Sequence, residues 1–243
     1  MMDLERTAAT VRGVASAHDY DRDLASIIDH TWLRPEAVPE EIDRLCDEAL
    51  AFGFRTVCVQ PTFVARAAGR LAGSAVGVAA VVAFPHGAAT TDAKVFELER
   101  ALTDGATELD VVANLGWIRA GEGARLTAEI AALVKAAGRA GAVKVILETA
   151  LFADAEKEAA AGAVMAGGPA FLKTSTGFGP GGATLADVAL LRRIAGGQAG
   201  VKASGGIKTR AQALALRGAG ADRLGASASV TLVTLADPAP GPA

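Results

Sequence analysis

The stretch AFLKTSTGFGPGG, residues 170–182, decides the fold: a short apolar strand runs directly into hydroxyl residues and a glycine-rich loop. Lys173 stands inside that strand, where burial of a charged ammonium group costs free energy. The segment GVKASG, residues 200–205, repeats the arrangement with Lys202. Polar residues near the end of a strand, followed by glycine, are typical of the functional end of parallel βα units.

The same alternation of strand and helix extends along the chain. Longer helical stretches, several of them ending in glycine as helix C-termini do, separate the short β-branched runs. We expect strands at 27–31, 56–60, 77–84, 108–114, 143–149, 171–176, 200–205 and 222–227. Such alternation predicts parallel βαβ units, and eight of them in 243 residues predict an α/β fold, a single-domain (β/α)8 TIM barrel. A doubly wound open sheet is the alternative, but no G-x-G-x-x-G follows the first strand.

The sequence indicates no boundary inside the barrel. We expect an N-terminal helical segment at 1–26, the barrel at 27–232 and a Pro-rich, frayed tail at 233–243.

Composition excludes several classes of function. The chain is 51% apolar with a net charge of −3 and no basic block, so nucleic-acid and anionic-membrane binding are not expected. The start of the chain lacks a secretory pattern, and the longest apolar run, 76–84, is far shorter than the roughly 20 residues of a membrane span. Cys46 and Cys58 have neither zinc nor disulfide spacing. We therefore expect a cytoplasmic protein with reduced thiols, no cofactor and no metal.

Polar residues near the strand ends point to amine chemistry. Lys173 and Lys202 lie on consecutive strands, which are about 4.8 Å apart in a sheet. Two partly buried ammonium groups that close disfavour the charged form, so one lysine becomes a neutral amine able to form a Schiff base with a carbonyl. Asp110, on another strand, is a candidate acid or base.

Other polar residues near the strand ends are explained more simply by structural roles than by catalysis. Asp29 and Lys144 are more simply read as an ion pair lining the barrel, Glu148 as a structural partner and Cys58 as a small core residue. His30 and His86 have no ligand spacing and read as ordinary strand-end residues.

The loops after the seventh and eighth strands are rich in glycine. This is the usual phosphate site of the barrel, where backbone N–H groups meet the anion. Gly205, Gly206, Gly225 and Ser227 suit close approach, and Lys208 could add charge. Tight βα turns explain the same glycines equally well.

The chain resembles the deoxyribose-phosphate aldolase family of class I, Schiff-base aldolases. The resemblance covers about residues 27–230, in segments such as IDHTWLRPEA, ELDVV, VKVILET, KTSTGF and VKASGGIKT. It implies a cytoplasmic, metal-free barrel, commonly a homodimer. It further implies reversible cleavage of 2-deoxy-D-ribose 5-phosphate to D-glyceraldehyde 3-phosphate and acetaldehyde.

The resemblance also assigns roles. Lys173 corresponds to the Schiff-base lysine, Lys202 to the second lysine and Asp110 to the acid/base aspartate. Asp29, Lys144 and Cys58 correspond to residues near the substrate. The phosphate contacts fall on Thr176, Gly177, Gly205, Gly206, Lys208, Gly225 and Ser227.

The chain departs from some relatives. Its only tyrosine is Tyr20, so it lacks the C-terminal tyrosine that helps some members move a proton. Phe178 stands where some members have lysine, which predicts weaker phosphate binding. Ala228 replaces a serine, and Gln60 a frequent asparagine.

Two other functions fit part of the pattern. Another Schiff-base aldolase or a transaldolase would share the lysine and the phosphate site and differ in substrate. A non-catalytic sugar-phosphate-binding barrel would not need the three residues Lys173, Lys202 and Asp110 together.

Overall fold

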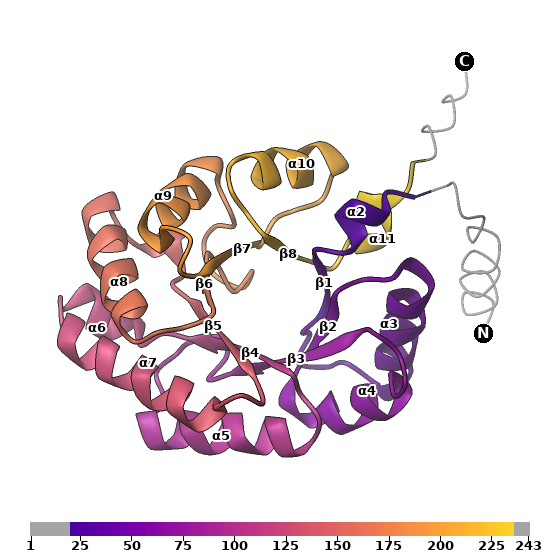
Figure 1. The fold of residues 1–243 in the computed structure, drawn as a ribbon, viewed down its shortest axis with the longest axis horizontal. Helices are drawn as coiled ribbons and strands as arrows, with labels where there is room; N and C mark the ends of the chain where they lie inside the picture. The colour runs from indigo at the N-terminus through magenta and orange to yellow at the C-terminus, as the bar shows by residue number, and fades with distance from the viewer. Residues whose placement is uncertain (1–19, 236–243) are drawn as a thin grey trace.

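Eight parallel strands close into a barrel in the computed structural model, which describes residues 20–235 (Figure 1). Each strand pairs with the next, and β8 pairs with β1. The strands are β1 (Ile28–Trp32), β2 (Thr56–Val59), β3 (Gly77–Val82), β4 (Glu108–Val112), β5 (Ala142–Ile146), β6 (Phe171–Lys173), β7 (Gly200–Ser204) and β8 (Arg223–Ala226). The predicted single-domain (β/α)8 barrel is confirmed, and all eight expected strands are present.

Helices surround the strands as an outer ring (Figure 1). They are α2 (Arg22–Ala25), α3 (Pro39–Phe52), α4 (Val64–Arg70), α5 (Thr91–Thr103), α6 (Leu115–Arg119), α7 (Gly123–Ala137), α8 (Asp154–Ala166), α9 (Leu185–Ala195), α10 (Arg210–Gly218) and α11 (Ser229–Val233), with the 3-10 turns η1 (Pro61–Phe63) and η2 (Thr149–Leu151). Among residues 20–235, no helix combines the length and apolar character needed to cross a bilayer.

The short helices α2 and α11 contact each other between α10 and α3, where the ring would otherwise be open (Figure 1). Tyr20 forms an antiparallel bridge with Thr234 and packs edge-on against Phe52. Residues 1–19 of the expected N-terminal segment and 236–243 of the expected tail lie outside the described residues.

The strands separate two apolar regions. Outward-facing side chains such as Val57, Val111 and Leu172 pack under the helices in the main core. A smaller cluster of Leu33, Cys58, Ala79 and Val81, with Phe84 against it, lies inside the barrel. This division follows from the strand period of two, because alternate side chains point to opposite faces. The inner cluster comes mainly from β2 and β3, so that side of the lumen is apolar.

A buried ion pair fixes α5 and α7 to the outside of β4. Lys94 Nζ is 2.7 Å from Glu129 Oε1 and donates to the Val112 carbonyl oxygen at 2.9 Å, and neither charged side chain is exposed. Thr91 Oγ1 also donates to Glu129, at 3.2 Å. Each charge has a partner, so the pair is tolerated although it is fully buried.

Replacing Glu129 is therefore expected to destabilise the barrel. Glu129→Gln leaves Lys94 buried without a counter-charge, which costs about 3 kcal/mol of unfolding free energy, measured by urea titration. The control is Glu158→Gln, which breaks a half-exposed pair with Arg193 and should change stability by less than about 0.5 kcal/mol. Equal effects of the two substitutions would contradict this account.

Candidate active site

The charged side of the lumen holds a cluster of four cationic side chains and three carboxylates. This lumen charge cluster consists of Lys144, Lys173, Lys202, Arg223, Asp29, Glu108 and Asp110. Its members come from β1, β4, β5, β6, β7 and β8. Period-2 alternation on each strand turns them all inward, so Lys173, Lys202 and Asp110 face the same lumen.

Asp110 is the centre of the cluster. Its Oδ2 accepts hydrogen bonds from Lys173 Nζ and Lys202 Nζ, each at 2.6 Å, and its Oδ1 accepts one from Lys144 Nζ at 2.7 Å. Lys173 and Lys202 are paired residues on the neighbouring strands β6 and β7. One carboxylate therefore joins three lysines from three strands.

A second set of contacts lies deeper in the lumen. Asp29 pairs with Lys202, lies 3.5 Å from Lys144 and accepts a hydrogen bond at 2.7 Å from Arg223 Nη1. Glu108 Oε2 lies 2.7 Å from Lys144 Nζ and accepts from Arg223 Nη1 at 2.8 Å. The expected ion pair of Asp29 and Lys144 is present, within a larger network than the sequence indicated.

The environment distinguishes the three lysines. Burial, together with the charge of Lys202 and against the attraction of Asp110, lowers the pKa of Lys173 below the ordinary lysine value. The pKa values of Lys144 and Lys202 are raised: burial opposes this, but their carboxylate neighbours outweigh it. The coulombic pull of Lys202, Lys144 and Lys173 keeps the carboxyls of Asp29 and Asp110 at pKa values below their usual range despite burial. Lys173 is thus the lysine that most readily becomes a neutral amine.

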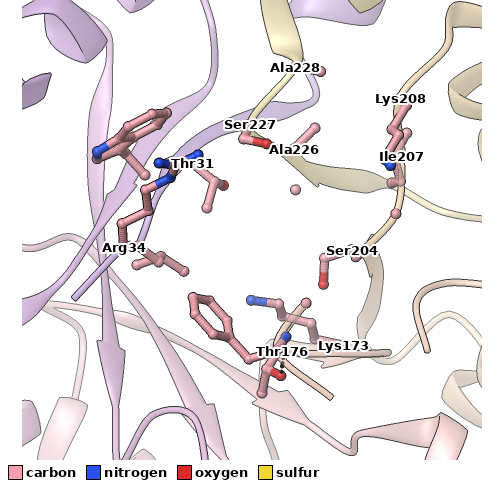
Figure 2. A pocket seen from close by; sticks show the side chains of 17 residues that line it. Thr31, Arg34, Lys173, Thr176, Ser204, Ile207, Lys208, Ala226, Ser227 and Ala228 are labelled. Atoms are coloured by element: carbon pink, nitrogen blue, oxygen red, sulfur yellow. Dashed lines mark hydrogen bonds between the residues drawn. The ribbon is translucent and has the colours of Figure 1, made fainter. Parts of the chain in front are cut away.

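Lys173 also reaches an open cavity of about 260 Å³ at the carboxyl ends of the strands (Figure 2). All seven residues expected at the phosphate line it: Thr176, Gly177, Gly205, Gly206, Lys208, Gly225 and Ser227. Ser204 and Phe178 line it too, while Asp110, Lys202, Lys144 and Asp29 lie beneath Lys173, away from the cavity wall. The cavity therefore joins the Lys173 amine to a glycine-rich wall.

The glycine loops meet backbone to backbone. Gly177, Gly205 and Gly206 have φ of +85°, +87° and +76°, which side chains other than glycine rarely adopt. A Cβ on Gly182 would lie 2.1 Å from the Gly205 carbonyl oxygen. These glycines are needed for the path of the loops after β6 and β7, whatever ligand the loops bind.

Glu148 holds the loop after β6. Its carboxylate is buried, its backbone is left-handed at φ +50°, and its Oε2 accepts from the Thr176 N–H at 3.2 Å and from the Thr176 hydroxyl. The Thr176 hydroxyl in turn accepts from the Phe178 N–H at 3.0 Å. Strand β6 ends at Lys173 rather than at the expected residue 176, and Thr176 already belongs to the loop that Glu148 holds. Glu148 is thus a structural partner of Thr176.

Arg34, which the sequence analysis did not single out, lines the opposite wall of the cavity from Lys208 (Figure 2). Its guanidinium stacks over the Trp32 ring at 5.1 Å. Phe178 contacts Phe84 edge-on at 5.3 Å, so it extends the apolar wall of β3 to the cavity. Arg34, Lys173 and Lys208 are the ionisable side chains among the described residues that line this cavity.

The remaining candidates lie elsewhere. His30 points outward and lies 2.7 Å from Glu48, and His86 is exposed, so neither lines the cavity. Cys58 is fully buried in the inner apolar cluster, with its Sγ 4.0 Å from Asp110 Oδ2. Burial raises the pKa of Cys58 to about 11, so it is a neutral thiol in the lumen wall. Among residues 20–235, no group of acidic, cysteine and histidine side chains is arranged to hold a metal ion.

A parallel barrel with an amine of lowered pKa, a bridging carboxylate and a glycine-lined cavity at its carboxyl end has the architecture of a carbonyl-directed lyase. The sequence model of the DeoC/LacD family aldolases matches residues 23–232. The chain belongs to this family.

Curated relatives support the assignment. The chain is 48% identical to the deoxyribose-phosphate aldolase of Crocosphaera subtropica, over 87% of this chain and 94% of that one. It is 47% identical to that of Desulfitobacterium hafniense, over 87% and 98%. The solved deoxyribose phosphate aldolase of Aeropyrum pernix, a tetramer, superposes with a TM-score of 0.80 at 36% identity, over 87% of this chain and 89% of that one.

The contact between Glu148 and Thr176 can be tested without a substrate. Glu148→Ala removes a charged acceptor from a buried N–H, and hydrogen bonds to charged groups contribute about 1.5 to 3 kcal/mol. We expect amide exchange at Thr176 and Phe178 to accelerate by about 10- to 100-fold, while exchange in β4 stays unchanged. Unaltered exchange at Thr176 would show that Glu148 does not hold this loop.

Proposed function

We propose that the protein is a class I aldolase that reversibly cleaves 2-deoxy-D-ribose 5-phosphate to D-glyceraldehyde 3-phosphate and acetaldehyde through a Schiff base on Lys173. The observation that carries the proposal is the position of Lys173. Of the three lysines in the cluster it alone lines the cavity, and it alone has a lowered pKa. The two curated relatives described above are both named deoxyribose-phosphate aldolase, which agrees with this proposal.

The first step is attack of the neutral Lys173 amine on the C1 aldehyde. A carbon–nitrogen bond forms, and loss of water from the carbinolamine leaves an iminium. Asp110 accepts hydrogen bonds from Lys173 and Lys202 at 2.6 Å, so it can take a proton from one nitrogen while Lys202 supplies another. Protons can thus pass between attacking amine and departing water within the cluster.

Cleavage of the C2–C3 bond follows. The C3 hydroxyl loses its proton, its oxygen forms the aldehyde of glyceraldehyde 3-phosphate, and the bonding pair moves into the iminium to give an enamine. Protonation of the enamine carbon and hydrolysis release acetaldehyde and restore the amine. Leu33, from the inner apolar cluster, and Phe178 line the cavity, and these apolar side chains suit the two-carbon fragment.

The phosphate lies in this proposal against the glycine-rich wall of the cavity. Gly177, Gly205, Gly206, Gly225 and Ser227 allow close approach, Lys208 supplies charge, and Thr176 fixes the loop through Glu148. Tyr20 packs against Phe52 on the outside of the barrel, so the proton at the acetaldehyde carbon must come from water or the cluster.

The proposal includes a cytoplasmic location, supported by two buried free cysteines, Cys46 and Cys58. The expected homodimer stays a prediction, and the related Aeropyrum pernix enzyme is a tetramer.

Borohydride trapping tests the Schiff base. Incubation with acetaldehyde and borohydride is expected to add an ethyl group to the peptide containing Lys173, detected by mass after digestion. Lys173→Ala should abolish this adduct and reduce aldolase activity to background, whereas Lys135→Ala, at an exposed position on α7, should leave both unchanged. An adduct on another lysine, or full activity of Lys173→Ala, would end the proposal.

Arg34 gives a second prediction. If its charge attracts the phosphate, Arg34→Gln should raise KM for deoxyribose 5-phosphate about tenfold and leave KM for unphosphorylated deoxyribose unchanged. Arg44 is the matched control: it also stacks over Trp32, at 5.7 Å, but does not line the cavity. A proportionate change for both substrates would rule out recognition of the phosphate by Arg34.

A further inference from the structure

The amino-terminal end of the lumen, where β4 and β8 begin, holds two members of the charge cluster that lie away from the cavity. Arg223 Nη1 donates to Asp29 at 2.7 Å and to Glu108 at 2.8 Å, and the guanidinium lies over the Phe171 ring at 5.3 Å. Glu108 also contacts Lys144 at 2.7 Å. Neither Arg223 nor Glu108 lines the cavity, and neither contacts Lys173, so neither can touch a substrate bound there.

The cluster as a whole has one cation more than it has carboxylates. A net charge inside a barrel is costly, so the arrangement favours loss of one proton. Arginine does not lose its proton in proteins. Lys144 contacts Asp29, Glu108 and Asp110, and Lys202 contacts Asp29 and Asp110. Lys173 contacts Asp110 alone within the cluster, so its proton is the least firmly held.

We propose that Arg223 and Glu108 are positioning residues that tune the protonation of Lys173 in opposite directions through the charge of the lumen charge cluster. Arg223 favours the neutral amine, and Glu108 limits this effect. This rests on the proposed function, in which that amine attacks the substrate. The pair acts through Lys144 and Asp29, which contact both it and the upper part of the cluster. The cluster has one cation more than it has carboxylates, and loss of the Lys173 proton removes that excess charge.

Other groups face Lys173 and must stay in place in the test. From β4 it meets Asp110, from β7 Lys202 and from β2 the Cys58 thiol. Across the cavity stand Lys208 and Arg34. Substitution at Arg223 or Glu108 leaves all of these groups unaltered, so a change in the protonation of Lys173 would report the cluster charge.

The experiment compares Arg223→Gln, Glu108→Gln and the double variant by the pH dependence of borohydride trapping of acetaldehyde on Lys173. Arg223→Gln removes a positive charge, so Lys173 should hold its proton to a higher pH and the midpoint should rise. Glu108→Gln removes a negative charge, so the midpoint should fall. A unit charge on the order of 10 Å away, at an effective dielectric constant of about 20, shifts a midpoint by about one pH unit.

The double variant is the decisive sample. It restores the charge balance, so its midpoint should return close to that of the unaltered protein although two buried groups have changed. A purely structural role predicts two impaired single variants, a worse double variant and no opposite shifts. Glu129→Gln is the control, because it removes a buried carboxylate outside the lumen and should leave the midpoint unchanged.

Each outcome decides between the two proposals. No adduct on Lys173 in the unaltered protein would refute the proposed function itself. An adduct whose midpoint does not move, or moves the same way in both single variants, would refute the role of Arg223 and Glu108. Should Arg223→Gln fail to fold by circular dichroism, Glu108→Gln must still lower the midpoint, and Arg223→Lys, which keeps the charge, must leave it in place.

Discussion

The hydrogen bonds that Asp110 accepts from three lysines are the interaction on which the rest of the site depends. Ammonium groups from β5, β6 and β7 would repel one another in a dry lumen, and the carboxylate from β4 makes their proximity possible. The three lysines differ in their other partners. Lys144 and Lys202 each contact a further carboxylate of the cluster, whereas Lys173 contacts Asp110 alone within it. One lysine with a lowered pKa and two with raised pKa values thus arise from one arrangement.

The barrel interior is divided by chemistry as well as by depth. Side chains of β2 and β3 make an apolar wall, whereas β4 to β8 and β1 carry the charges. The Lys173 amine lies between these two sides: burial removes it from water, and the Asp110 carboxylate attracts its positive charge. Desolvation lowers its pKa, and the carboxylate limits how far.

Much of this could be predicted from the sequence because strands impose a period of two. That period assigned Lys173, Lys202 and Asp110 each to one face of its strand, although the sequence alone did not fix that this face is the lumen, and glycine after a strand indicated the cavity wall. Arg223 and Glu108 also face inward. They contact each other, and they contact Asp29 on β1 and Lys144 on β5. Contacts across a closed barrel leave no local pattern in the sequence, so these pairings could not be predicted. The contact of Glu148 with Thr176 depends on a left-handed residue that is not glycine, and Arg34 on how the loop after β1 folds back.

The length of chain between cluster partners has a consequence for how the barrel is assembled. Lys202 follows Asp29 in the chain by 173 residues, and Arg223 follows it by 194. A chain emerging from the ribosome therefore exposes β1 long before these two counter-charges have been synthesised. A partly assembled barrel would bury unpaired carboxylates, which is unfavourable. Asp29 therefore gains its Lys202 and Arg223 counter-charges only when β7 and β8 are in place, and the lumen charge cluster is complete only in the closed barrel.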